Sequence, residues 1–93
     1  MKAIWKGTVI AQSDETVIVE SNHYFPRGSL HNEYFTSSSK TTYCGWKGEA
    51  NYFSVTVEGE TNEDAAWYYE NPKDAAKEIL GMVAFWRGVE VTK

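Results

Sequence analysis

The stretch NYFSVTVE, residues 51–58, alternates apolar and polar side chains clearly. Successive side chains point to opposite faces of a β-strand, so this period of two predicts a strand with one buried face. The expected buried face carries Phe53, Val55 and Val57, and the opposite face carries Tyr52, Ser54 and Thr56. Gly59 follows directly and allows the chain to turn there.

Shorter strand signals lie on both sides of this stretch. Residues 2–12 alternate weakly, residues 16–20 form a β-branched run, and residues 13–15 between them are typical of a hairpin loop. Two further short strands are expected at residues 83–85 and 89–91, joined around Gly88. The serines at 37–39 indicate a loop by composition.

One helix is expected near the C-terminus. Asn71 is suited to the N-cap, Pro72 to the first helical position and Asp74 to the first turn. An apolar stripe follows, and Gly81 is suited to end the helix. The prediction is a single domain, residues 1–93, of the α+β class, dominated by antiparallel sheet and with this one short helix.

The composition limits the kind of protein. Ninety-three residues can bury one core and form a shallow pocket. The sequence contains four Trp and six Tyr, more large amphipathic rings than a small core readily holds. Some of them are therefore expected to line a groove or an interface, where a ring can be half buried.

Charge and hydropathy argue against several partners. The net charge is −4 and no basic run occurs, which disfavours nucleic acid. No apolar run approaches the ~20 residues of a membrane span, and no hydrophobic signal core opens the sequence. The single cysteine, Cys44, cannot form an intramolecular disulfide. A cytoplasmic location without membrane contact is expected.

Five segments, taken together, resemble a known family. They are KAIW (2–5), HYFP (23–26), CGWKG (44–48), AWYY (66–69) and VAFW (83–86). Their order and spacing resemble the domain-of-unknown-function 427 family, a group of small bacterial proteins. The resemblance implies a β-tent fold, in which two small antiparallel sheets are joined at one edge.

Family members are sometimes labelled nucleotidyltransferases, and the residues do not support that label. Two-metal nucleotidyl transfer needs carboxylates that converge on Mg²⁺. The aspartates Asp14, Asp64 and Asp74 lie far apart in the sequence, and no phosphate-binding glycine loop is present. One cysteine and two histidines are too few for a typical structural zinc site. No metal or other cofactor is expected.

The segment CGWKG, residues 44–48, is the most informative for function. Two glycines bracket a ring and a cation, which predicts a tight turn that holds Trp46 and Lys47 outward. Either the tryptophan folds onto the core and the lysine is solvated, or Trp46 forms a pocket wall. In the second case Lys47 would face an anionic or carbonyl group.

Two residues are weak catalytic candidates. His23 could donate to a ligand or transfer a proton, or it could be a structural histidine bonded to the backbone. Cys44 could pair with His23 as a thiolate nucleophile, or it could simply be a small buried side chain.

The remaining aromatic segments each split between two faces. In a strand, Trp67 and Tyr69 share one side and Tyr68 takes the other, and Phe85 and Trp86 separate likewise. We expect Tyr68 and Trp86 to face the pocket. The predicted ligand-binding residues are His23, Tyr24, Trp46, Lys47, Tyr68 and Trp86.

The residue inventory favours a module that binds a small planar or anionic ligand in an aromatic pocket. Two alternatives stay open. One is a protein-interaction or homo-oligomerisation domain, and the other is a metal-independent enzyme that uses His23 and Cys44.

Overall fold

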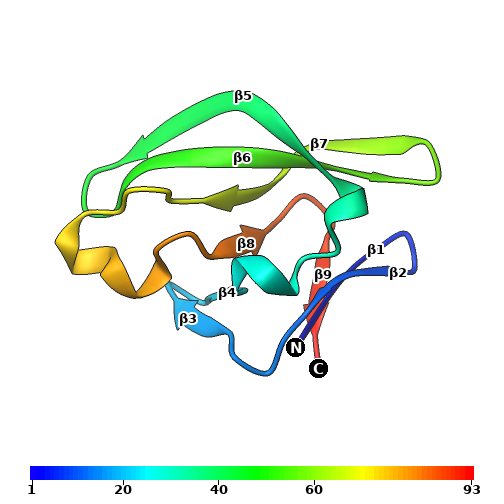
Figure 1. Cartoon of the computed structure of the whole chain (residues 1–93), viewed down its shortest axis with the longest axis horizontal. Helices are drawn as coiled ribbons and strands as arrows, with labels where there is room; N and C mark the ends of the chain where they lie inside the picture. The colour runs from blue at the N-terminus through cyan, green and yellow to red at the C-terminus, as the bar shows by residue number, and fades with distance from the viewer.

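Nine β-strands make up most of the computed structural model, which describes residues 1–93 (Figure 1). The strands are β1 (Lys2–Trp5), β2 (Thr8–Gln12), β3 (Val17–Val19), β4 (Asn22–Tyr24), β5 (Phe35–Cys44), β6 (Gly48–Val57), β7 (Glu60–Tyr68), β8 (Val83–Phe85) and β9 (Glu90–Thr92). Three short 3₁₀ helices connect them: η1 (Arg27–Ser29), η2 (Asn32–Tyr34) and η3 (Asp74–Ile79). Every strand pair is antiparallel, which confirms the expected fold class.

The strands form three sheets, of which the largest is central. It contains four strands in the order β5-β6-β7-β8, and the two smaller sheets are β2-β1-β9 and the β3–β4 hairpin. The resemblance implies two antiparallel sheets. The structure contains two larger sheets, β5-β6-β7-β8 and β2-β1-β9, and the β3–β4 hairpin forms a third, two-stranded sheet. Figure 1 shows β5 and β6 together along one side of the molecule, with β1, β2 and β9 grouped near both chain ends.

Strand β6 confirms the alternation that the sequence predicts and buries both of its faces. Phe53, Val55 and Val57 belong to one cluster of buried residues, whereas Ala50 and Tyr52 belong to another. Neighbouring side chains of a strand point to opposite faces, so the two clusters lie on opposite sides of the central sheet. We call them the first and the second core.

Different elements cover the two cores. The first core, under the sheet β2-β1-β9, consists of Ala3, Ile10, Ala11, Phe25, Leu30, Phe53, Val55, Val57, Ala65, Ala66, Val83 and Phe85. The second core, under the β3–β4 hairpin and η3, consists of Val19, Tyr24, Ala50, Tyr52, Tyr69, Ala76, Ile79 and Ala84. The second cover is smaller, because it is made of two three-residue strands and one irregular turn of helix.

Several boundaries differ from the sequence prediction. The first hairpin turns at Lys6–Gly7, with φ of +50° and +73°, and not at residues 13–15, which connect β2 to β3. The serines at 37–39 lie inside β5, where the pairing with β6 is irregular.

The helix near the C-terminus is shorter than expected. It is a 3₁₀ element that starts at Asp74, with Lys73 and not Asn71 at its N-cap, and Ala76 leaves helical geometry. A bridge between Tyr69 and Leu80 ties this segment to the end of β7 and competes with regular helix formation. No helix of the structure has the length and apolar character needed to cross a membrane.

Two isoleucines test how far the first core determines stability. Ile10 is fully buried and Ile18 is 61% exposed, so Ile10→Ala should lower the free energy of unfolding by about 2–5 kcal/mol. Ile18→Ala should change it by less than about 0.5 kcal/mol. Urea denaturation of both variants measures the difference, and equal losses would contradict this assignment of the core.

Candidate functional site

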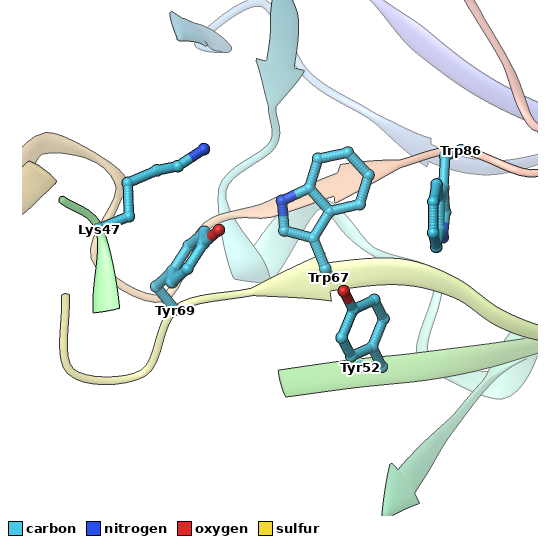
Figure 2. Close-up of a pocket in the computed structure, with 5 residues that line it drawn as sticks. All are labelled: Lys47, Tyr52, Trp67, Tyr69 and Trp86. Atoms are coloured by element: carbon cyan, nitrogen blue, oxygen red, sulfur yellow. The ribbon is translucent and has the colours of Figure 1, made fainter. Parts of the chain in front are cut away.

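A surface cavity of about 190 Å³ lies at the second core, and aromatic side chains form most of its wall (Figure 2). The lining residues are Lys47, Tyr52, Trp67, Tyr69 and Trp86. The volume is below the roughly 300–1,000 Å³ of drug-sized ligand sites, so the cavity suits a small ring system.

Strand register brings the rings together. Tyr52 on β6 lies opposite Trp67 on β7, and Trp67 lies opposite Ala84 on β8. Tyr69 lies two residues beyond Trp67 on the same face, and Trp86 lies two residues beyond Ala84, just past the end of β8. Because Ala84 contributes only a methyl group to this row, space remains between the larger rings.

The two indoles are held by polar contacts within the fold. Trp67 donates from Nε1 to the Tyr24 hydroxyl at 3.1 Å, and Trp86 donates from Nε1 to the carbonyl oxygen of Asp64. Their rings meet edge to face, with centroids 5.9 Å apart. Since both indole N–H groups already have partners, the tryptophans offer a ligand their ring surfaces.

Lys47 is the one charged side chain that lines the cavity. It ends the turn between β5 and β6, and its carbonyl oxygen accepts a hydrogen bond from Lys73 N at 2.9 Å. Gly48 has φ +108°, a backbone conformation that a residue with a side chain would adopt only with strain. The outward position expected for Lys47 is corrected: its side chain lies inside the fold and is only 6% exposed, because it pairs with Glu20 and packs beside Tyr69.

An ion pair compensates the buried charge. Lys47 Nζ donates to a carboxylate oxygen of Glu20, which lies in the turn between β3 and β4. The same Nζ lies 5.4 Å from the ring centroids of both Trp46 and Tyr69. A buried ammonium without such partners would be strongly disfavoured.

These contacts shift three pKa values. Burial by itself would lower the pKa of Lys47, but the hydrogen bond to Glu20 and the nearby phenols outweigh it, so the pKa rises above its ordinary value. The hydrogen bond from Lys47, followed by its charge, lowers the pKa of Glu20. Burial raises the pKa of Tyr69, partly offset by Lys47. At neutral pH the site therefore holds an ammonium, a carboxylate and a protonated phenol.

Two more cations lie against the lining rings. The Lys40 ammonium is 5.8 Å from the Tyr52 ring centroid, and the Arg87 guanidinium is 4.7 Å from that of Trp86. Three cations therefore lie near the lining rings, and the Glu20 carboxylate balances the charge of one of them, Lys47.

The structure brings together some of the residues that the sequence predicts for a ligand site. Lys47 and Trp86 line the cavity. Trp46 is 41% exposed beside the Lys47 ammonium, and Tyr24 stands behind Trp67 as its hydrogen-bond acceptor. Both therefore border the cavity without lining it.

Tyr68 and His23 lie elsewhere. Trp67 and Tyr69 share a face as expected, but theirs is the cavity face, whereas Tyr68 points to the first core and stacks on Phe53 at 4.7 Å. The expected pocket position of Tyr68 is therefore corrected. The His23 ring nitrogen Nδ1 lies 3.3 Å from the Thr16 hydroxyl.

The weak catalytic pair is not assembled. Cys44 packs at the margin of the second core as a free thiol, and no hydrogen bond joins it to His23. No group of three or more His, Cys, Asp or Glu side chains is arranged to hold a metal ion.

Three lining residues, Tyr52, Trp67 and Tyr69, were missed as site residues in the sequence. The alternation of AWYY pairs Trp67 with Tyr69 but does not indicate which face is the cavity face. Glu20 gives no local signal, because its partner is 27 residues away.

Comparison with protein families identifies the chain as a member of one family. The family model described as "Domain of unknown function (DUF427)" matches residues 1–93, so the chain belongs to this family. This confirms the resemblance based on the five segments. A comparison with curated proteins finds no match.

The ion pair predicts a specific loss of stability in acid. The pKa of Glu20 lies below its ordinary value of 4.5 in the folded chain, so the stabilisation is present above that pH and is lost as the pH falls through the folded-state pKa. Glu20→Gln should therefore lower the melting temperature at pH 7, and its difference from the unmodified chain should shrink as the pH falls below 4.5.

Differential scanning fluorimetry between pH 3 and 7 measures this difference. Glu58→Gln is the matched control, because Glu58 also occupies a hairpin turn, with φ of +51°, and makes no ion pair to Lys47. A Glu20→Gln difference that is independent of pH would contradict the assigned role of the pair.

Proposed function

We propose that this domain binds a small planar molecule that carries an anionic or carbonyl oxygen. The observation that supports this most is a buried ammonium, Lys47, at the margin of a cavity otherwise lined by aromatic rings. Ligand sites typically combine apolar walls with a few placed polar groups, and this cavity has that composition.

The polar end of the ligand would lie at Lys47 and Tyr69. An ammonium has three donors, and Glu20 accepts from one of them, so further donors are free for a ligand oxygen. The protonated phenol of Tyr69 is a second possible donor at the same end of the cavity. In Figure 2 the Lys47 side chain reaches over Tyr69 towards the Trp67 indole.

The planar end would pack on the tryptophans. Trp67 and Trp86 meet edge to face, and Tyr52 is tilted by 37° to Trp86 at a centroid distance of 6.4 Å. Flat rings gain offset-stacked and edge contacts in such a corner. The neighbouring charges of Lys40, Lys47 and Arg87 disfavour a cationic ligand.

Matched small probes test the proposal. Benzoate should bind more tightly than cyclohexanecarboxylate, which lacks a flat ring, and more tightly than benzamide, which lacks the charge. Titration followed by the indole N–H signals in NMR spectra measures each affinity. Signals of Trp67 and Trp86 should shift, whereas that of Trp5 on β1 should not.

Two variants test whether Lys47 and Trp86 contact the bound benzoate. Lys47→Met should weaken benzoate binding at least about tenfold, since hydrogen bonds to charged groups are worth roughly 1.5–3 kcal/mol. Trp86→Leu should weaken it about twofold to tenfold, the range of an aromatic pair. Trp5→Leu is the control and should leave binding unchanged. Absence of binding by all three probes would contradict the proposal.

Self-association is a second candidate, because several large apolar side chains are exposed. They are Ile18, Tyr43, Trp46, Leu80 and Trp86, with exposures from 40% to 68%. Native mass spectrometry of freshly purified protein separates the two functions. Ligand binding predicts a monomer with an added mass that Lys47→Met removes, whereas a bare dimer would favour the interface.

A further inference from the structure

The two partners of the buried ion pair differ in their freedom to move. The Lys47 side chain is only 7% exposed, whereas that of Glu20 is 54% exposed. Lys47 is held between the Trp46 and Tyr69 rings, and Glu20 extends from the turn after β3. The pair can therefore open by movement of Glu20 into solvent, whereas the ammonium stays in the cavity wall.

We propose that Glu20 is an internal counter-ion that an anionic ligand displaces from Lys47. This inference rests on the proposed function and specifies its ligand class, which is planar anions such as aromatic carboxylates or sulfonates. A negative oxygen in the cavity can replace both the charge and the hydrogen bond that Glu20 supplies. A neutral carbonyl oxygen replaces only the hydrogen bond, so neutral ligands bind with Glu20 still in place.

Glu20 is the only carboxyl group among the titratable residues that act on the Lys47 ammonium. The others are the phenols of Tyr24 on β4 and Tyr69 at the end of β7. The Cys44 thiol acts on Tyr69 in turn, and His23, on the same hairpin as Glu20, contacts Thr16. Glu20 is therefore the group that competes with an anionic ligand for Lys47, and its titration should account for any change in ligand affinity at acidic pH.

Benzenesulfonate is the appropriate probe, because it stays anionic where a carboxylate probe would itself take up a proton. At pH 7, Glu20→Gln should bind benzenesulfonate about twofold to fivefold more tightly than the unmodified chain, which is the range of a partly exposed ion pair. The neutral analogue benzenesulfonamide should bind both proteins equally.

Glu58→Gln is again the matched control. It removes the same charge from a hairpin turn with nearly the same backbone angle, φ +51° against +52° for Glu20. It should leave benzenesulfonate affinity unchanged, which separates the local counter-ion from an effect of net charge.

A second measurement uses the unmodified chain and needs no variant to fold. Displacement from Lys47 should raise the pKa of the Glu20 carboxyl towards 4.5, and a ¹³C NMR titration with and without benzenesulfonate reports that change directly. By the same linkage, benzenesulfonate should bind more tightly as the pH falls, and Glu20→Gln should remove that dependence.

The outcomes separate this inference from the proposed function. Equal benzenesulfonate affinities for Glu20→Gln and Glu58→Gln, or an unchanged Glu20 titration on binding, would overturn the counter-ion role. The proposed function would still stand if binding continued to require Lys47 and Trp86. Failure of every protein to bind either probe would overturn both.

Discussion

A four-stranded sheet that is apolar on both faces is the constraint on which the rest of this structure depends. Alternate residues of β6 and β8 enter the first or the second core, so each face needs its own cover. A chain of 93 residues supplies one complete cover, the sheet β2-β1-β9, and one partial cover, the β3–β4 hairpin with η3. The cavity lies at the second core, on the side of the partial cover.

The placement of Lys47 is difficult to explain by stability alone. Removing an ammonium from water is costly, and replacing a buried ion pair by apolar groups often leaves stability unchanged or improves it. Here the charge is nevertheless kept at the cavity wall by two rings and one carboxylate. The proposed anionic ligand would use this charge.

Local sequence signals were sufficient for β6, β8 and the turn at residues 45–47, because each depends on neighbouring residues, but they did not predict the inward direction of Lys47. They were insufficient where distant contacts decide. The register of Tyr52 against Trp67 selects the cavity face, and so Tyr69 takes the place expected for Tyr68. Asn71 and Pro72 indicated the start of a helix, but the helical element begins only at Asp74. The bridge between Tyr69 and Leu80 is the distant contact that the local signal does not include.

The sheet β2-β1-β9 joins the two ends of the chain, with Lys2 paired to Thr92 (Figure 1). Strand β1 is made well before β9, so one of its edges has no partner until β9 has been made. Contacts of such long sequence separation slow folding, because loop closure must precede them. During synthesis the cover of the first core therefore stays incomplete, and its apolar strands remain open to association with other chains until β9 has emerged.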